Sequence, residues 1–177
     1  MGSGNGYYTK SVGHEGPDFA TSKRALAKLT ELKSKDINCT IIFEYYSPGA
    51  IRAIPNGTMA FNRTGKATAI IMLQWDNTVA DHSRRAREVA YELAVSILGD
   101  KSLLNDPLWF GYGNYGERPV SLSGPSEFKP LVDGDGPDDM KDRALSAFGP
   151  NYSRLQRVKR EYDPGNVFNK WFPIVPA

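Results

Sequence analysis

The stretch Gly-Tyr-Gly-Asn-Tyr-Gly at residues 111–116 has three glycines at the spacing of a loop that binds the phosphates of a dinucleotide cofactor. In such a loop a strand ends at the first glycine and a helix begins at the third, so that the helix N-terminus meets the pyrophosphate. Here Glu117, Arg118 and Pro119 follow, and the chain then runs through repeated prolines and glycines that do not support a helix. The sequence therefore disfavours a dinucleotide site and indicates that the glycines let a strand pass close to a flat neighbour.

Acidic residues and histidines do not indicate a metal site. The acidic stretch 133–139 begins like a calcium loop, but Pro137 stands at the third ligand position and Ala144 stands where a closing glutamate is required. His14 and His82 are far apart in the sequence and have no carboxylate-histidine spacing around them, so both are interpreted as ordinary surface histidines. No metal is predicted.

The single cysteine, Cys39, excludes an internal disulfide. Its neighbours Ile37, Ile41 and Ile42 are apolar, which predicts a packed thiol rather than a nucleophile.

Length and composition bound the class of protein. A chain of 177 residues corresponds to about one domain, and its 40% apolar and 24% charged residues are ordinary for a globular protein. No run approaches the roughly 18 apolar residues that a membrane span needs. The net charge of +2 gives no basic field for nucleic acid or for an acidic membrane surface. The N-terminus lacks the basic-then-apolar pattern of a secretion signal, so we expect a cytoplasmic protein.

The first half of the chain shows a helix, two strands and a second helix. Residues 18–34 predict an amphipathic helix, whose apolar positions are Phe19, Leu26, Leu29 and Leu32. Strands are predicted at 38–46 and 66–75, the latter as a central strand because it contains a continuous apolar run. Thr78 followed by Asp81 is a capping-box pattern for a helix that ends at Gly99, with an apolar stripe formed by Ala86, Val89, Ala90, Leu93 and Ile97.

The second half has fewer regular elements. A further strand is predicted around 107–115, and the prolines and glycines of 117–136 predict a loop or lid. Short helices are expected at 138–147 and 151–162, followed by an extended tail. The order helix, strand, strand, helix, strand, helix predicts a single α+β domain with a mainly antiparallel sheet backed by helices.

The end of the chain resembles a known family. Residues 151–174, NYSRLQRVKREYDPGNVFNKWFPI, are similar to the C-terminal signature of the berberine bridge enzyme-like FAD-linked oxidases, in a form that fungal members often carry. Shorter upstream stretches resemble the family in the same order: 7–11 the opening of its substrate domain, 43–46 its first strand, 60–63 the turn that approaches the flavin ring, 73–75 its central strand and 112–115 its Tyr-x-Asn-Tyr.

The resemblance implies a substrate domain, with residues 7–148 forming the domain body and 149–177 the terminal segment of one unit, 1–177. In the family one face of the sheet lies against a flavin, which a long N-terminal domain holds through covalent links to a histidine and a cysteine. This chain begins where that domain would end. The expected cofactor content of the chain is therefore none, with FAD present only if a partner supplies it.

The resemblance also assigns roles to residues. A tyrosine of the Tyr-x-Asn-Tyr strand takes the substrate's proton in the family, so Tyr112 and Tyr115 are the positions for that role, and Arg63 is a candidate to hydrogen-bond a polarised carbonyl. The candidates for lining the substrate site are Glu44, Phe61, Asn62, Gln74, Trp75, Trp109 and Asn114. The residues alone leave an alternative open, in which both tyrosines are amphipathic sheet residues that pack and make one hydrogen bond each.

Two functions follow from a substrate domain without its flavin domain. The first is a flavin-free enzyme of secondary metabolism that holds a small natural product for a non-redox step such as cyclisation, cycloaddition or isomerisation. The second is the substrate-binding half of a split or truncated FAD-dependent oxidoreductase, since no side chain accepts a hydride. An inactive remnant is a third reading. A small molecule is the expected partner, nucleic acid and membrane are not, and the former flavin-facing surface suggests a homodimer.

Overall fold

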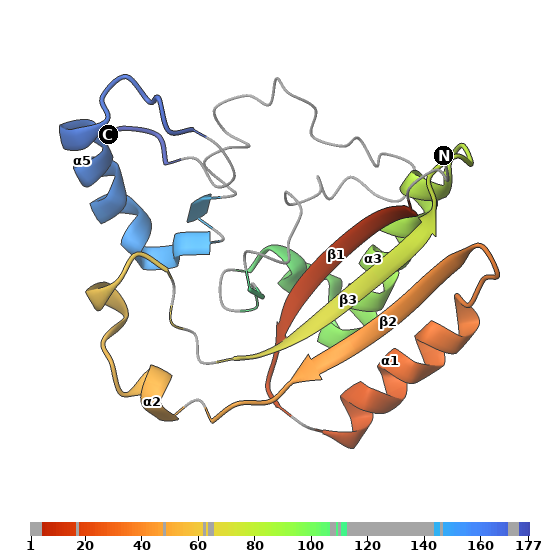
Figure 1. The fold of residues 1–177 in the computed structure, drawn as a ribbon. Helices are drawn as coiled ribbons and strands as arrows, with labels where there is room; N and C mark the ends of the chain where they lie inside the picture. The colour runs from red at the N-terminus through yellow and green to blue at the C-terminus, as the bar shows by residue number, and fades with distance from the viewer. Residues whose placement is uncertain are drawn as a thin grey trace.

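The computed structural model describes residues 5–16, 18–47, 49–61, 63, 66–106, 109, 111–112, 144–145, 147–169 and 174–177. The elements within them are β1 (Asn5–His14), α1 (Phe19–Glu31), β2 (Ile37–Glu44), α2 (Gly49–Arg52), β3 (Ala67–Asp76), α3 (His82–Leu98) and α5 (Tyr152–Tyr162), as Figure 1 shows. Short 3-10 turns occupy Asn56–Thr58, Lys101–Asn105 and Gly149–Asn151. The fold is α+β with an antiparallel sheet backed by helices, as predicted.

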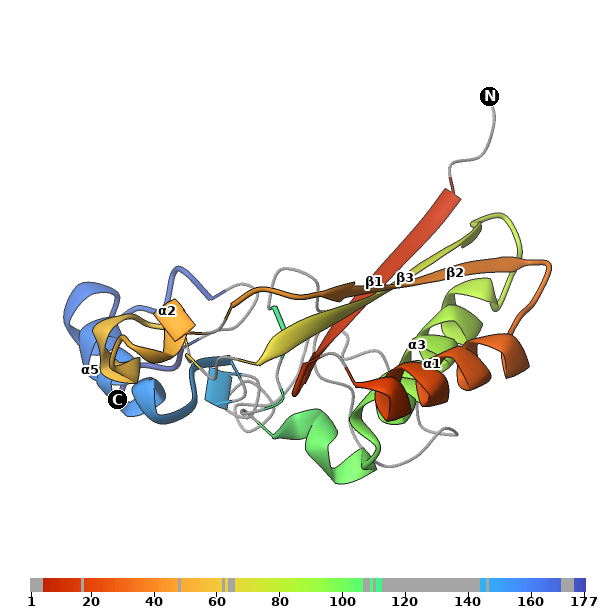
Figure 2. The same ribbon diagram turned by 90° about the horizontal axis from the view of Figure 1, so that it is seen from below.

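The three strands lie in the order β1-β3-β2, and both pairs are antiparallel. Tyr8, Leu73 and Cys39 are opposite one another across the sheet. Because side chains alternate along a strand, these three point to one face and their neighbours point to the other. Figure 2 shows α1 and α3 on a single face, which we call the helix-covered face; the opposite side is the outer face.

The core lies between the helix-covered face and α3. Strand β3 is central, as predicted, and its apolar run is buried except at Met72. The predicted stripe of α3 is also confirmed: its residues Ala86, Val89, Ala90, Leu93 and Ile97 are all buried. The helix ends at Gly99, whose φ of 77° is a left-handed conformation that glycine adopts readily.

Helix α1 packs through a different face from the one predicted. Phe19 and Leu26 are 82% and 65% exposed, whereas Thr21 and Ala25 are buried. At about 100° per residue, Phe19 and Leu26 lie on the side of the helix opposite to Thr21 and Ala25. Leu29 and Leu32 do pack against the core. The small residues Thr21 and Ala25 therefore let the helix approach the core, and the two large apolar residues face away.

Two other local predictions are wrong. Residues 5–14 form strand β1, although no strand was predicted before residue 18. The capping box at Thr78 does not form, because the Asp76 carboxylate accepts hydrogen bonds from the Thr78 backbone N–H and hydroxyl. Helix α3 instead begins at His82 after Asp81, which has a φ of 68° and makes no side-chain cap bond. A turn held by Asp76 thus replaces the expected helical cap.

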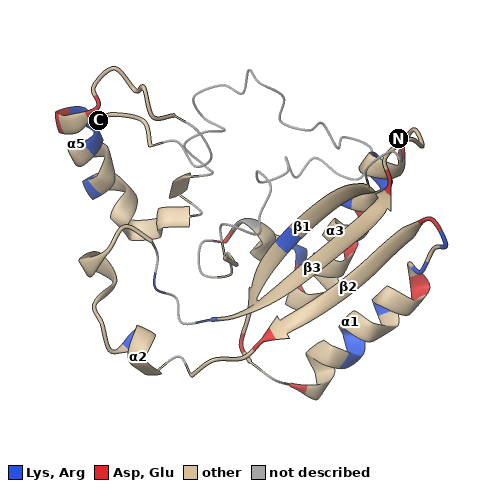
Figure 3. Ribbon diagram, in the orientation of Figure 1, with Lys and Arg blue, Asp and Glu red and all other residues tan. Residues whose placement is uncertain are grey.

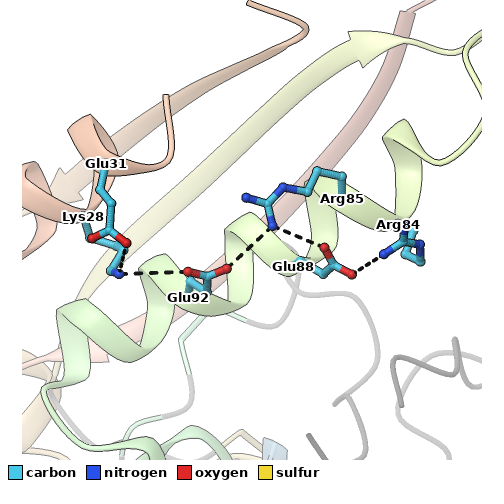
Figure 4. Close-up of polar contacts among 6 residues, drawn as sticks. All are labelled: Lys28, Glu31, Arg84, Arg85, Glu88 and Glu92. Carbon is cyan, nitrogen blue, oxygen red and sulfur yellow. Dashed lines mark hydrogen bonds and ion pairs between the residues drawn. The ribbon is translucent and has the colours of Figure 1, made fainter. Parts of the chain in front are cut away.

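Ion pairs on the surface join α1 to α3, as Figure 4 shows. Lys28 lies 2.8 Å from Glu31 on its own helix and 4.0 Å from Glu92 on α3, and Arg85 lies 3.7 Å from Glu92. Such exposed pairs each contribute about 0–1 kcal/mol, so apolar burial dominates the packing of the two helices. No helix in the described part of the chain is long and apolar enough to cross a membrane.

Candidate functional site

The outer face of the sheet combines apolar and hydrogen-bonding side chains. Its positions are Tyr7, Thr9, Ser11, Asn38, Thr40, Ile42, Glu44, Thr68, Ile70, Met72 and Gln74. Gln74 Nε2 donates a 2.9 Å hydrogen bond to the Tyr7 hydroxyl across the β1–β3 pair. Ile42 and Met72 are both 41% exposed, although they are large apolar residues. This face therefore offers a partly apolar surface with an amide and a phenol at one end.

The predicted lining residues Gln74 and Trp75 are neighbours on β3 and point to opposite faces. Gln74 lies on the outer face, whereas Trp75 is 5% exposed and belongs to the core. A Cβ at Gly6 would come within 2.7 Å of Trp75 Cζ2, so the indole lies directly against the β1 backbone. Gln74 and Trp75 therefore do not line one surface together.

Glu44 and Gln74 lie on the same face but at opposite ends of it. Glu44 is opposite Thr68, six residues from Gln74 along β3, a separation of roughly 20 Å at the rise of a strand. Trp109 lies nearer the Glu44 end, because its carbonyl accepts a hydrogen bond from the Gly13 N–H, and Gly13 is also opposite Thr68.

A cluster of aromatic and charged side chains surrounds this end of the sheet. We define the strand-end cluster as His14, Glu15, Phe43, Tyr45, Tyr46, Lys66 and Trp109. The His14 ring makes edge-on contacts with Phe43 and Tyr45 at centroid distances of 5.4 and 5.5 Å. Strand ends that meet here bring these residues together from β1, β2 and the approach to β3.

His14 is 2% exposed, so its interpretation as a surface histidine is wrong. Nδ1 lies 3.1 Å from the Gly16 carbonyl and 3.2 Å from the Gly16 N–H, and the tautomer decides which bond forms. Nε2 is buried and has no hydrogen-bond partner among the described residues. A buried imidazole with one unused nitrogen is a group that could hold or move a proton. His82, by contrast, is half-buried at the start of α3.

Lys66 connects the cluster to the predicted residue Trp109. Its ammonium group lies 4.0 Å from the centroid of the Trp109 ring and pairs with Glu15. The Tyr46 hydroxyl donates to the Lys66 carbonyl at 2.5 Å. A cation over an indole face is an electrostatic contact that orders both side chains. Trp109 is thus held by a lysine that the sequence did not single out.

The first residues of the glycine motif, Gly111 and Tyr112, lie against β1. Gly13 N–H donates to the Trp109 carbonyl at 2.8 Å, and the Ser11 hydroxyl donates to the Tyr112 carbonyl at 2.9 Å. A Cβ at Gly111 would lie 2.7 Å from the Ser11 carbonyl carbon. This segment therefore lies along the free edge of β1, where only glycine fits at position 111. Its described residues 109 and 111–112 are not assigned to a strand, and the rest of the predicted strand 107–115 lies outside the described residues.

Tyr112 is 48% exposed at this edge. Arg63 lies elsewhere: its backbone N–H donates to Asn56 Oδ1 at 2.6 Å, and its Nε is buried without a hydrogen-bond partner in the described part of the chain. Phe61 is half-buried two residues before it. The predicted site residues Asn62, Asn114 and Tyr115 lie outside the described residues.

The terminal segment is organised by one carboxylate. Asp163 follows α5, forms an ion pair with Lys159 and accepts hydrogen bonds from the N–H groups of Val167 and Phe168 at 2.8 and 3.0 Å. Lys159 also donates to the Phe168 carbonyl at 2.6 Å. The hydrogen bond from Lys159, followed by those from the two N–H groups, lowers the pKa of Asp163. The Asp-Pro-Gly-Asn-Val-Phe stretch is therefore a turn closed by its first residue.

Side-chain bonds tie this segment to the turn at Asn56–Thr58. Asn151 Nδ2 donates to the Asn56 carbonyl at 3.1 Å, and Arg154 donates to the Gly57 carbonyl at 2.7 Å. Since Asn56 also holds the Arg63 backbone, the terminal segment positions the loop that leads into β3.

Sequence reasoning missed His14 and Lys66 as members of a cluster. Their only signal was their place next to strand ends, and for His14 that signal required recognising β1. The alternating apolar pattern of a strand is weak in residues 5–14, because Tyr8 and Val12 are the only large apolar residues on the inward side of β1. Cys39 is the opposite case: its side chain is partly buried and packs against the core, which confirms a packed thiol, and burial raises the pKa of the thiol to about 11.

Comparison with known proteins finds similarity at the C-terminal end. Residues 136–173 match the family described as berberine and berberine like. A stretch of 37 residues is 62% identical to the FAD-linked oxidoreductase pgmH of Aspergillus terreus and 60% identical to the protein of that name from strain NIH 2624 / FGSC A1156. Each match covers 21% of this chain and 8% of the relative, so only a small part of either relative's length is represented here.

Proposed function

We propose that this chain provides the substrate-binding sheet of an FAD-linked oxidoreductase, with its outer face against a flavin held by protein outside the described residues. The observation that carries the proposal is the match of residues 136–173 to the berberine-like family, whose segment here is joined to a sheet that α1 and α3 cover on one face. The names of the two Aspergillus relatives support the same reaction class.

The outer face fits a flat ring better than it fits phosphates. Ile42 and Met72 give exposed apolar surface, and Gln74 and Tyr7 give hydrogen-bonding groups beside it. Flavin rings combine an apolar body with polar edges, so these four residues are the ones that would contact the ring. When bound, the flavin supplies the acceptor for a hydride from the substrate.

The residues of this chain would position the substrate and handle its proton. Tyr112 lies half-exposed at the edge of β1, where its side-chain oxygen, once deprotonated to the phenolate, could take a proton from a substrate held near the strand-end cluster. Glu44 and Trp109 line the same end of the sheet in this proposal, and Arg63 is a candidate to hydrogen-bond a carbonyl of the substrate. Asn62, Asn114 and Tyr115 keep their proposed roles on the resemblance alone.

The test is binding of lumiflavin, which is the isoalloxazine ring without ribityl phosphate. Quenching of lumiflavin fluorescence measures the binding. We expect saturable quenching by the unchanged chain, and about ten-fold weaker binding when Ile42→Lys and Met72→Lys are combined, because two charges would be placed under an apolar ring. Leu26→Lys, on the exposed side of α1, is the matched control and should bind normally. Absence of saturable quenching by the unchanged chain would contradict the proposal.

A non-redox function is the second candidate, and the Gln74–Tyr7 pair favours it. An amide and a phenol joined at 2.9 Å could polarise a carbonyl of a small natural product and hold it for cyclisation, cycloaddition or isomerisation without a cofactor. Turnover by colourless protein that also fails to bind lumiflavin would replace the first function by this one. Unchanged turnover by Tyr112→Phe would remove Tyr112 from either mechanism.

A further inference from the structure

A cavity of about 460 Å³ lies on the side of the sheet away from the outer face. Its lining residues are Leu29 and Thr30 of α1, Leu32, Lys33, Ser34 and Lys35 of the turn after it, Ile37, Asn38 and Cys39 of β2, and Val89 of α3. Small-molecule sites have volumes of roughly 300–1,000 Å³, so the cavity is large enough for a compact ligand. Asn38 is an outer-face position, but the four residues proposed above to contact a flavin, Tyr7, Ile42, Met72 and Gln74, do not line the cavity.

The inner part of the cavity is apolar. Val89 and Ile37 are its most buried lining residues, at 3% and 6% exposed, and the side chains of Leu29 and Leu32 also pack against the core. Cys39 lies beside them, and burial raises the pKa of its thiol to about 11, so the sulfur is uncharged at neutral pH. A ligand body placed here would therefore meet hydrocarbon and a neutral thiol.

The rim of the cavity is basic. Lys33 and Lys35 are both exposed lining residues, and no Asp or Glu lines the cavity. Neither lysine has an ion-pair partner in the described part of the chain. Figure 3 shows basic residues along α1 and on the turn that connects it to β2.

The nearest carboxylates are engaged elsewhere or lie outside the lining. Glu31 and Glu92 are both within 4.0 Å of the Lys28 ammonium group, as Figure 4 shows, and Asp36 is in the turn but does not line the cavity. Among the residues that line the cavity, no carboxylate therefore matches the positive charge of Lys33 and Lys35.

We propose that this cavity is a second ligand site, which binds a compact apolar carboxylate with its hydrocarbon body against Ile37 and Val89 and its anionic group at Lys33 and Lys35. The sheet separates this site from the outer face, so the two sites would be occupied independently. An apolar pocket with convergent cationic groups recognises the charge and the shape of such an acid together.

Cys39 gives a direct readout, because it is the single cysteine of the chain. The probes are 1-naphthoate and its uncharged analogue 1-naphthamide, and the measurement is the rate at which excess N-ethylmaleimide labels Cys39. We expect saturating 1-naphthoate to slow labelling about ten-fold or more. The concentration that gives half-maximal protection should be about five-fold higher for 1-naphthamide, because one ion pair near the surface contributes up to about 1 kcal/mol to binding. Equal labelling rates with and without 1-naphthoate would overturn the site.

Charge variants test the anionic end. In the double variant Lys33→Gln and Lys35→Gln, the concentration of 1-naphthoate that gives half-maximal protection should rise about five-fold. The corresponding concentration of 1-naphthamide should stay unchanged. Lys23→Gln removes an exposed lysine of α1 that does not line the cavity, and should change neither. Equal protection by both probes, or an equal effect of the double variant on both, would show that the lysines do not select an acid and would overturn the assigned ligand class.

Discussion

Leu93 of α3 is completely buried, whereas Tyr162 of α5 is 77% exposed, and this contrast separates two regions of the molecule. The sheet half consists of β1, β2, β3, α1 and α3 and is held by an apolar core. The C-terminal half consists of the turn Asn56–Thr58, α5 and the residues after it. There, Tyr152 is the one large hydrophobic side chain that is buried among the described residues, and bonds from side chains to backbone groups, such as those of Asp163 and Arg154, join the segments.

This difference in how the two halves are held together determines how specific the sequence pattern of each half is. Apolar burial tolerates many sequences, because any residues of suitable size and period fill a core. A turn closed by one carboxylate needs an aspartate at position 163. It also needs the correct spacing from that aspartate to Lys159 and to the N–H groups whose hydrogen bonds the carboxylate accepts. The C-terminal half therefore carries a specific sequence pattern, and the match to the berberine-like family falls on residues 136–173.

The largest expected effect comes from removing core volume in the sheet half. Leu93→Ala deletes a completely buried side chain, and the free energy of unfolding should fall by about 2–5 kcal/mol from lost burial and the cavity left behind. Urea denaturation followed by circular dichroism measures the change. Leu26→Ala, at a leucine that is exposed on α1, is the control and should cost less than about 0.5 kcal/mol. Equal losses for both variants would mean that the core is not where the structure places it.

An intermediate effect is expected at the edge of β1. Gly111→Ala would place a methyl group 2.7 Å from the Ser11 carbonyl carbon, so the segment must move away from the strand. Overpacking of this kind costs about 1–3 kcal/mol. Gly57→Ala is the matched control in the C-terminal half, because no atom lies within 4 Å of a Cβ there. If Gly111→Ala unfolds at the same urea concentration as the unchanged chain, the close contact with β1 is absent in solution.

Much of the sheet half was predictable because its signals are periodic. The apolar run of β3 and the stripe of α3 are long, and a long stripe survives small errors at its ends. Strand β1 was not predictable from its own residues, since its inward side is completed by partners far away in sequence. The packing face of α1 was also mispredicted, because size suggested Phe19 and Leu26 where close approach favoured Ala25.

The candidate site was predictable only in part. Resemblance pointed to β3, to residues 112–115 and to Arg63, but it could not show that Gln74 and Trp75 face opposite ways until β3 had a register. The strand-end cluster depends on three strand ends meeting, which is tertiary information. His14 therefore looked like an isolated histidine in the sequence and is a buried one in the fold.

The smallest expected effect concerns acid and is confined to the C-terminal half. The pKa of Asp163 is lowered, first by the hydrogen bond from Lys159, so its carboxylate stabilises the folded state above the unfolded Asp pKa of about 3.9. That contribution is lost as the pH falls below this value and through the lower folded pKa. Hydrogen exchange of the Val167 and Phe168 amides should therefore lose protection in this acidic range, beyond the ordinary pH dependence of exchange, while amides of β3 stay protected.

Two variants separate this carboxylate from the other acids of the chain. Asp163→Asn should expose both amides to exchange already at neutral pH and remove their acid-dependent step, because an amide oxygen is a weaker acceptor and cannot pair with Lys159. Glu161→Gln, an exposed residue of the same helix, should keep that step. If Asp163→Asn also kept the acid-dependent step, some other group would close the turn. The C-terminal half would then not depend on the Asp163 carboxylate in the way that the sheet half depends on apolar burial.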